Sequence, residues 1–280
     1  MPTRPAVPGF RLLGRLGGGP HAEVYEARPE DGGEPVAVKV LRDDCRDNPD
    51  AVLLIRREAR AGRAVRHRNV VTLIADRTDR PPYFIVMELL PGESAKRRVR
   101  DGGRLPLPTA LAVGRQVAEG LAALHAAGFV HGDVKTDNVR LASPGRAVLV
   151  DLGFTHYPGD LVEWSKSGHM MGTPNYLAPE LCRKPPTDTA AADVFGLGVT
   201  LFELLTGRLP YRSGPVRDVI RWRREDGPAR LDAVPGDWPT GLEDLLAGMT
   251  ARSPADRPRA KPLVQKLIAM QILAMRKRAG

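Results

Sequence analysis

The segment VHGDVKTDNVRL carries three polar side chains with complementary chemistry in one short stretch. At their spacing, Asp133 can orient a hydroxyl nucleophile, Lys135 can neutralise a phosphoryl group in transfer, and Asn138 can offer an amide oxygen to a metal ion. Asp151 follows the apolar stretch VLV and precedes Gly153, which would allow a sharp turn toward the same cleft. Carboxylate and amide oxygens beside phosphate favour Mg²⁺ over zinc. The sequence therefore predicts metal-assisted phosphoryl transfer to a hydroxyl group.

A lysine among valines in PVAVKV needs a partner. In a β-strand the side chains alternate, so the three valines would point to one face while Ala37 and Lys39 point to the other. The helical stretch IRREARAGRAV supplies Glu58, whose carboxylate could pair with Lys39 and hold it for an anionic ligand. A single helix glutamate is usually only a solvated charge, so this pairing is a hypothesis for the structure to test.

A glycine-rich stretch formed by Leu16, Gly17, Gly18 and Gly19 lies between two strand candidates upstream of Lys39. Backbone without Cβ atoms can approach phosphates closely and offer N–H donors. Turn glycines are common, however, so the stretch gains weight only because the lysine strand follows it. Together the two segments predict a phosphate-binding region.

The secondary structure that positions these residues changes along the chain. The first 90 residues have the pattern of strands interrupted by one helix, which Asn48-Pro49 would open, whereas the rest shows helical periodicity punctuated by Gly and Pro. We therefore expect an α+β fold of two lobes. A small β-rich lobe with one helix would cover residues 1–90, and a larger α-helical lobe would cover residues 91–280.

These segments occur in the order typical of bacterial serine/threonine protein kinases, and the chain resembles that family over nearly its whole length. The matching motifs are the glycine-rich loop from Leu16 to Val24, Lys39 in VAVK with its helix partner Glu58, the catalytic loop HGDVKTDN, the metal motif DLG, GTPNYLAPE, DVFGLGVTLFELLTGRLPY and SPADRP. The resemblance implies a bilobal protein kinase fold that uses ATP and Mg²⁺. Its catalytic residues would be Asp133, Lys135, Lys39 and Glu58, and its metal ligands Asn138 and Asp151.

The resemblance also implies the acceptor and the nucleotide site. Lys135 together with GTPNY implies Ser or Thr acceptors on a protein substrate. The implied nucleotide-binding residues are Leu16, Gly17, Gly18, Gly19, Val24, Ala37, Lys39, Met87, Glu88, Leu90 and Arg140. Val24 and Ala37 would form the apolar roof over adenine, and Met87 would be the bulky residue at the back of the adenine site. Glu180 would pair with Arg257, Asp193 would brace the catalytic loop, and Thr173 would contact Asp133 and Lys135.

Two departures from the family pattern bear on phosphate handling. Ala22 replaces the third glycine of the nucleotide loop and Pro20 lies inside it, which predicts a stiffer lid, fewer phosphate contacts and weaker ATP binding. Gly132 replaces the arginine that, in the family, binds a phosphorylated activation segment, the stretch of chain that joins DLG to APE. We therefore hypothesise that activity does not require a phosphate on Thr155, Ser165 or Ser167.

Two further departures bear on geometry. Gly62 stands one turn after Glu58, where the family places a large apolar residue, so a looser helix is expected that would need an activating partner or a homodimer for support. Arg140 stands where the family has an apolar floor for adenine. Its aliphatic stem and planar head could stack there, or could obstruct the site.

Two other functions compete with an active protein kinase. A small-molecule phosphotransferase of the aminoglycoside-kinase kind also carries HGD, but GTPNYLAPE, DVFGLGV and the DRP arginine belong to the protein-substrate platform of protein kinases. A pseudokinase that binds nucleotide and partners without catalysis is the second alternative, motivated by Ala22, Gly62, Gly132 and Arg140. An active kinase is favoured because Lys39 and the other chemically indispensable groups are all present.

Composition limits the partners and the location. No apolar run is long enough to cross a bilayer, and the amino-terminal MPTRPAVPGF has no signal-peptide core, so we expect a cytoplasmic protein. The formal charge of +9 comes with arginine clusters that do not alternate with aromatic residues, so no nucleic-acid partner is expected. Arg217, Arg221, Arg223 and Arg224 would suit an acidic protein substrate, although a solvated helix face is the favoured explanation. Cys45 and Cys182 predict two reduced thiols.

Overall fold

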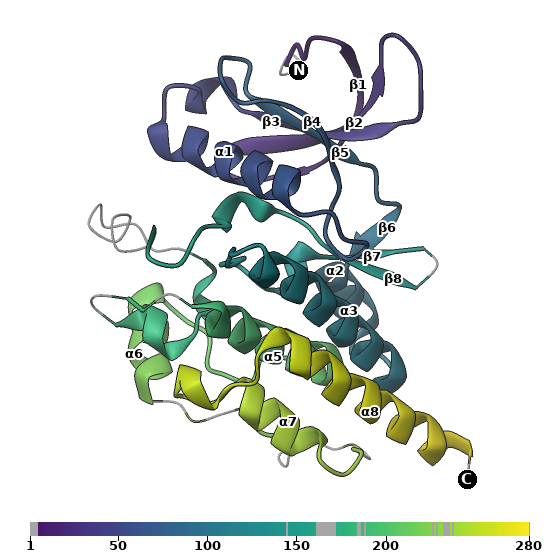
Figure 1. Cartoon of the computed structure of the whole chain (residues 1–280), viewed down its shortest axis with the longest axis vertical. Helices are drawn as coiled ribbons and strands as arrows, with labels where there is room; N and C mark the ends of the chain where they lie inside the picture. The colour runs from purple at the N-terminus through teal and green to yellow at the C-terminus, as the bar shows by residue number, and fades with distance from the viewer. Residues whose placement is uncertain are drawn as a thin grey trace.

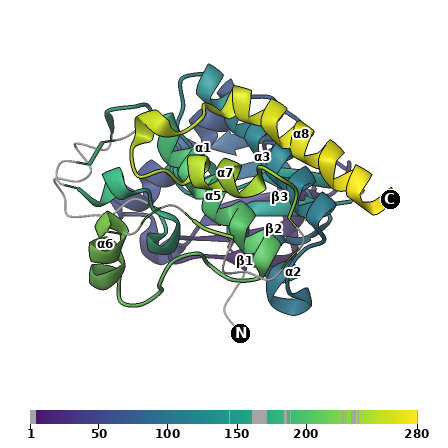
Figure 2. The ribbon, with the colours of Figure 1, turned by 90° about the horizontal axis from the view of Figure 1, so that it is seen from below.

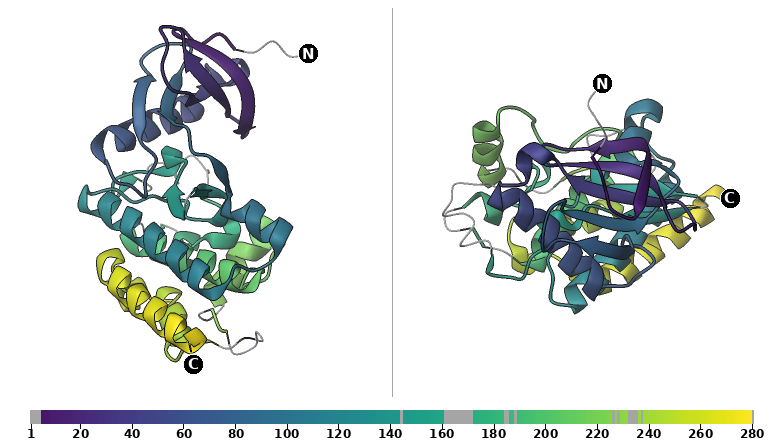
Figure 3. Two further views of the ribbon diagram at one scale, coloured as in Figure 1. Left: turned by 90° about the vertical axis from the view of Figure 1, so that its right-hand side faces the viewer. Right: turned by 90° about the horizontal axis from the view of Figure 1, so that it is seen from above.

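The computed structural model describes residues 5–143, 145–160, 172–183, 186–187, 189–225, 227, 229–231, 236 and 238–279. Its amino-terminal part is a sheet with one long helix, and this part sits above a second part made mainly of helices (Figures 1 and 3). The fold is therefore α+β and bilobal, as the sequence predicts.

The amino-terminal sheet is antiparallel, with the strand order β1–β2–β3–β5–β4. Its strands are β1 (Phe10–Gly18), β2 (Ala22–Pro29), β3 (Val36–Leu41), β4 (Leu73–Arg77) and β5 (Phe84–Glu88). The alternation predicted for β3 is observed. Its three valines join an apolar cluster on one face, whereas Ala37 belongs to the main core on the other. Lys39, two positions from Ala37, shares this second face.

Helix α1 (Pro49–Ala64) packs against β3, β4 and β5. Asn48 starts it, because its side chain accepts hydrogen bonds from the backbone N–H of Asp50 at 3.0 Å and of Ala51 at 3.2 Å. Pro49 occupies the first turn, where a missing N–H is tolerated. The helix start predicted at Asn48-Pro49 is confirmed, and Glu58 lies on the buried side of α1.

The helical part is built around α5, whose residues from Ala192 to Leu205 are all buried. Its apolar residues surround the axis, as expected for a central helix. The helices of this part are α2 (Ala95–Gly102), α3 (Leu107–Ala126), α5 (Ala190–Thr206), α6 (Val216–Glu225), α7 (Leu242–Met249) and α8 (Ala260–Ala279). Seen from below, α8 runs beside α3, while α7 lies under α5 (Figure 2). Across the described ranges, every helix is too short or too polar to cross a lipid bilayer.

A small antiparallel sheet, β6 (Gly92–Ser94), β7 (Val139–Ala142) and β8 (Arg146–Leu149), lies between the two parts. It is tied to the chain between α1 and β4, since Leu149 N–H donates to Asn69 O and Val71 N–H donates to Leu149 O, both at 2.9 Å. Short 3₁₀ turns complete the frame: η1 (Asp43–Cys45), η2 (Thr136–Asn138), η3 (Leu152–Phe154), η4 (Pro174–Tyr176), η5 (Pro179–Cys182) and η6 (Pro254–Asp256). The residues of the catalytic loop and of DLG thus flank the hairpin β7–β8.

Candidate active site

Lys39 reaches from β3 to two carboxylates. Its Nζ lies 2.6 Å from Glu58 Oε2 on α1 and 2.7 Å from Asp151 Oδ1. Burial alone would lower the pKa of Lys39, but the carboxylates of Asp151 and Glu58 outweigh burial and raise this pKa above its usual range. The pairing of Lys39 with Glu58 predicted from the sequence is therefore present, and Lys39 is a fixed ammonium group between the two parts of the fold.

Asp151 begins the turn η3 with a left-handed backbone, φ 61°. The sequence predicts that Gly153 allows this turn, but the positive φ falls on Asp151 itself, a residue type that tolerates the left-handed region better than most. Glu58 supports the turn, because its Oε1 accepts a hydrogen bond from Leu152 N–H at 3.3 Å. Burial opposes ionisation of Asp151, yet the Lys39 ammonium lowers the pKa of its carboxyl overall.

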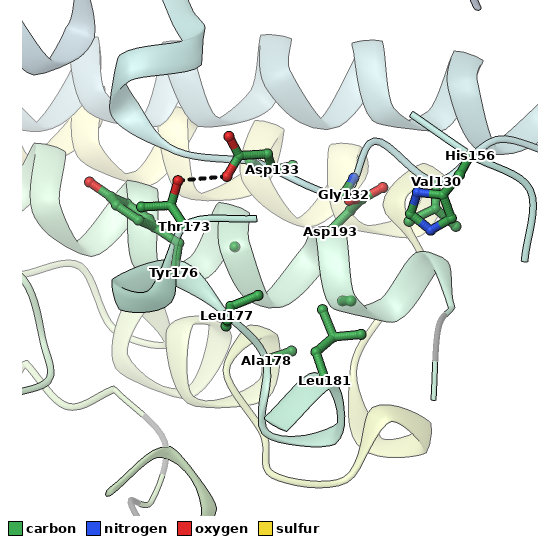
Figure 4. Close-up of a pocket in the computed structure, with 13 residues that line it drawn as sticks. Val130, Gly132, Asp133, His156, Thr173, Tyr176, Leu177, Ala178, Leu181 and Asp193 are labelled. Carbon is green, nitrogen blue, oxygen red and sulfur yellow. Dashed lines mark hydrogen bonds between the residues drawn. The ribbon is translucent and has the colours of Figure 1, made fainter. Parts of the chain in front are cut away.

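The catalytic-loop residues form one hydrogen-bonded cluster with the activation segment. Lys135 Nζ donates to Asp133 Oδ2 and to Thr173 Oγ1, both at 2.6 Å. Thr173 in turn donates to Asp133 Oδ1 at 2.8 Å (Figure 4). The amide nitrogen of Asn138 donates to Asp133 O at 2.9 Å and to Asp133 Oδ2 at 3.0 Å. The contacts implied for Thr173 are thus present, and the Asp133 carboxylate is held by three side chains.

Asp193, near the start of α5, holds the backbone of the same loop. Its carboxylate accepts hydrogen bonds from His131 N–H at 2.8 Å and from Gly132 N–H at 2.9 Å, and its Oδ2 lies 2.8 Å from His125 Nε2. Burial would raise the pKa of Asp193, but the hydrogen bond and charge of His125 lower it overall. The predicted brace is therefore present, and His125 is a partner that sequence reasoning missed.

A pocket lies beside Asp133, between the catalytic loop, α5 and the segment that runs from Thr173 to Leu181 (Figure 4). Asp133 and Thr173 form part of its polar lining, and Leu177 and Leu181 contribute to an apolar wall. Tyr176 also lines it, between the catalytic loop and α5. The aspartate proposed to receive the acceptor hydroxyl therefore lies next to a partly apolar hollow.

Several residues implied for adenine binding belong to the main core. Ala37, Met87 on β5 and Leu90 just beyond it are members of this core, and Val24 packs against it. Arg140 on β7 is half-buried, and its Nε donates to Leu90 O at 3.3 Å. Burial lowers the pKa of Arg140.

The glycine-rich stretch forms the β1–β2 hairpin. Gly17 pairs with Val24 and Gly18 with Glu23, while Gly19 N–H donates to Ala22 O at 2.8 Å. Leu16 lies on β1, with 46% of its surface exposed. Ala22 therefore serves as the first residue of β2, and Pro20 lies in the tight connection between the strands. Glu88 is assigned to the nucleotide site through its backbone, and its side chain pairs with Arg146 at 2.8 Å.

The donor set fits a magnesium ion. Val150 N–H donates to Asn138 O at 2.9 Å, which places Asn138 beside the residue that precedes Asp151. Because the amide nitrogen of Asn138 is fixed by Asp133, its amide oxygen is left for another ligand. One amide oxygen and one ionised carboxylate match the preference of Mg²⁺ for hard oxygen ligands.

Two departures acquire a structural reason. A Cβ built on Gly132, which has φ +81°, would lie 2.8 Å from Phe154 O, so glycine suits both the backbone and the space. A Cβ on Gly62 would lie 2.7 Å from Leu73 Cβ. The sequence predicts a looser α1 at Gly62. Instead, α1 lies close against β4 there, because Leu73 fills the space.

The arginines of α6 do not form one exposed surface. Arg223 is 1% exposed, stacks on Tyr211 at 3.8 Å and donates to Asn175 O at 2.9 Å. Arg224 Nε donates to Cys182 O at 2.9 Å. The interpretation of Arg223 as a docking residue for an acidic substrate is therefore wrong, because its side chain is internal. Arg221 is exposed and pairs with Asp218 at 2.9 Å.

Two residues of the activation segment, Glu180 and Thr155, are buried in the structure. Glu180 and Arg257 form a bidentate pair at 2.6 and 2.7 Å, as the resemblance implies. Thr155, named as a phosphate acceptor, is completely buried in this structure. Ser165 and Ser167 lie outside the described residues.

Glu203 on α5 is a site-organising residue that sequence reasoning missed. Its buried carboxylate accepts hydrogen bonds from Lys96 at 2.7 Å, from Thr136 at 2.9 Å and from the Tyr176 hydroxyl. It thereby joins α2, the catalytic loop and the activation segment. The available signal was a single carboxylate in the otherwise apolar stretch GLGVTLFELL.

The sequence matches the protein kinase domain family over residues 10–268, so the chain belongs to the protein kinases. Among curated proteins it resembles serine/threonine-protein kinase PkaA of Streptomyces coelicolor, with 32% identity over 278 residues that cover 94% of this chain and 50% of that protein. PkaB of the same organism is 35% identical over 90% of this chain and 60% of its own length.

PknL of Mycobacterium tuberculosis is 32% identical over 89% of this chain and 62% of its own length. The chain thus falls within the bacterial serine/threonine protein kinases by similarity, and it spans between 50% and 62% of the length of these three relatives.

Proposed function

We propose that this chain is an ATP- and Mg²⁺-dependent protein kinase that transfers the γ-phosphoryl group of ATP to Ser or Thr hydroxyls of protein substrates. The observation that carries the proposal is Lys39, held at 2.6 Å from Glu58 and 2.7 Å from Asp151. This arrangement places an ammonium group that would bind phosphate beside a carboxylate that would bind metal. Phosphoryl transfer requires both groups together.

The chain's own residues would divide the reaction as follows. Lys39 binds ATP phosphates, Asp133 orients the acceptor hydroxyl and takes its proton late, and Lys135 offsets the charge of the phosphoryl group in transfer. Thr173, hydrogen-bonded to Asp133 and Lys135, keeps both groups in register. Asn138 and Asp151 would hold Mg²⁺, which neutralises phosphate charge when bound.

The residues near the adenine complete the proposal. Val24, Ala37 and Met87 would enclose the base, and Arg140 would lie under it with its guanidinium anchored on Leu90 O. We further propose that activity does not require a phosphate on the activation segment. Gly132 supports this, because no arginine precedes Asp133 to grip one.

Transfer from radiolabelled ATP with Mg²⁺ tests the proposal, using a generic basic protein and the chain itself as acceptors. Asp133→Asn and Lys39→Met should each abolish transfer, and phosphatase treatment should leave the wild type active. Binding of a fluorescent ATP analogue without transfer by the wild type would contradict the proposal and favour a nucleotide-binding pseudokinase.

A further inference from the structure

Arg60 on α1 stacks on two aromatic rings from other parts of the chain. Its guanidinium carbon lies 4.7 Å from the ring centre of Tyr157 and 5.8 Å from that of Phe129. The two rings are themselves stacked, with centres 4.6 Å apart and planes inclined by 21°. Such cation–ring contacts are attractive because a planar guanidinium meets the negative face of a ring.

The rings come from the two segments that frame the catalytic chemistry. Phe129 precedes the catalytic loop, and Tyr157 follows the turn that begins at Asp151. Backbone hydrogen bonds between Val130 and His156, at 2.9 and 3.1 Å, pair these segments in antiparallel register. In that register the ring-bearing residues are the next pair, so the backbone itself holds the two rings together.

Asp160 adds a charge to the same contact. Its carboxylate lies 3.8 Å from the Arg60 guanidinium and also accepts a hydrogen bond from Tyr157 N–H at 3.2 Å. Asp160 N–H donates to Tyr157 O at 3.1 Å, which closes the turn. The turn therefore presents one ring and one carboxylate to a single arginine.

The alternative is a surface contact with no effect on activity, because the side chains of Arg60 and Asp160 are 42% and 38% exposed. The position of Arg60 argues against it. The same helix carries Glu58, which holds Lys39 at 2.6 Å and the Leu152 N–H at 3.3 Å. The contacts of Arg60 with the two rings and with Asp160 therefore also restrain the helix that aligns the phosphate-binding lysine.

We propose that Arg60 is a positioning residue that clamps α1 to Phe129 and Tyr157, and thereby links this helix to the segments that hold the catalytic loop and the DLG turn. The inference rests on the proposed function, and it explains how α1 can stay in place although Gly132 offers no cation to a phosphate. Arg60 touches no reacting group, so its loss should act by lowering the population of aligned enzyme. The catalytic efficiency kcat/KM for ATP then falls, because the phosphate-binding lysine is in place in a smaller fraction of the molecules.

Steady-state kinetics of the phosphatase-treated chain test this with Arg60→Ala, Arg60→Lys, Tyr157→Phe and Tyr157→Leu. Arg60→Ala and Tyr157→Leu should each lower kcat/KM for ATP about three- to tenfold. Tyr157→Phe keeps the ring and should retain activity, and Arg60→Lys should fall between the wild type and Arg60→Ala. The double variant Arg60→Ala/Tyr157→Leu should lose less activity than the product of the two single losses, because both variants remove the contact between Arg60 and Tyr157.

Arg63→Ala is the matched control, since Arg63 is an exposed arginine of α1 paired with Asp76 at 3.0 Å, and it should leave kcat/KM for ATP unchanged. Hydrogen–deuterium exchange across residues 49–64 gives a readout that needs no turnover, and Arg60→Ala should speed exchange there more than Arg63→Ala does. Equal exchange in the two variants overturns the clamp even if the wild type is inactive. A wild type without turnover would instead count against the proposed function alone.

Discussion

The backbone carbonyl of Phe154 lies so close to Gly132 that it leaves no space for a side chain: an ideal Cβ on Gly132 would be 2.8 Å from Phe154 O. The backbone of Gly132 is left-handed, with φ +81°, and its N–H is held by Asp193 at 2.9 Å. The residue before the proposed catalytic aspartate is therefore fixed by two constraints, one conformational and one steric.

Gly132→Ala should lower the free energy of unfolding by about 2–4 kcal/mol, because it combines left-handed strain with a backbone clash. Gly9→Ala is the control, since Gly9 has φ +83° with open space around it and should lose only about 1–2 kcal/mol. Urea unfolding of both variants measures the difference. Equal losses would mean that the Phe154 contact relaxes without cost.

Gly62 and Leu73 should show a strong energetic coupling. Gly62→Ala would gain up to about 1 kcal/mol in helix propensity, but its Cβ would meet Leu73 Cβ at 2.7 Å, so a net loss of about 1–3 kcal/mol is expected. In a Leu73→Gly background the same change should become neutral or stabilising. A double-mutant cycle by urea unfolding measures this, and additive changes would refute close packing of α1 on β4.

Two buried ion pairs could be predicted from the sequence, each on a different basis. Lys39 with Glu58 follows from a buried cation that needs a carboxylate, whereas Glu180 with Arg257 is implied by the family resemblance alone. The partner of Gly62 could not be deduced. Leu73 reaches it through the packing of a helix on a strand, and no local pattern specifies which side chain fills that space.

The arginines of α6 show the same limit. Arg223 and Arg221 are two positions apart in VRDVIRWRRE, yet one is internal and the other exposed. Helical periodicity places them on different faces but does not say which face is buried, because a stretch rich in arginine has few apolar residues to mark it. The stacking of Arg223 on Tyr211 depends on how the connection between α5 and α6 folds back onto α6, which the sequence pattern does not specify.

Charge reversal should therefore change the stability of the protein much more at Arg223 than at Arg221. Arg223→Glu should cost about 3–5 kcal/mol of stability, because it buries a carboxylate against an aromatic ring and removes the hydrogen bond to Asn175 O. The Arg221 side chain is 64% exposed, so Arg221→Glu should change the free energy of unfolding by no more than about 0.5 kcal/mol. Thermal unfolding measures both. A folded Arg223→Glu variant with wild-type stability would show that the internal site adapts.

Asp193 should make the stability of the fold depend on acid pH. The folded state lowers the pKa of its carboxyl below the usual 3.8, so its contribution is fully present above about pH 3.8 and is lost as the pH falls through the folded-state pKa. Asp193→Asn removes the charged acceptor of the His131 and Gly132 N–H groups. It should therefore lower the free energy of unfolding by about 2–4 kcal/mol at neutral pH.

Urea unfolding of wild type and Asp193→Asn between pH 7 and pH 3 measures this dependence. The difference between them should stay constant down to about pH 4.5 and then narrow, because protonation removes from the wild type the charge that the variant already lacks. Asp218→Asn is the control, since Asp218 sits in an exposed pair with Arg221 and should change stability by no more than about 0.5 kcal/mol at any pH. A difference that widens as the pH falls would mean that Asp193 is protonated in the folded state, and that the catalytic loop is braced by a neutral acid.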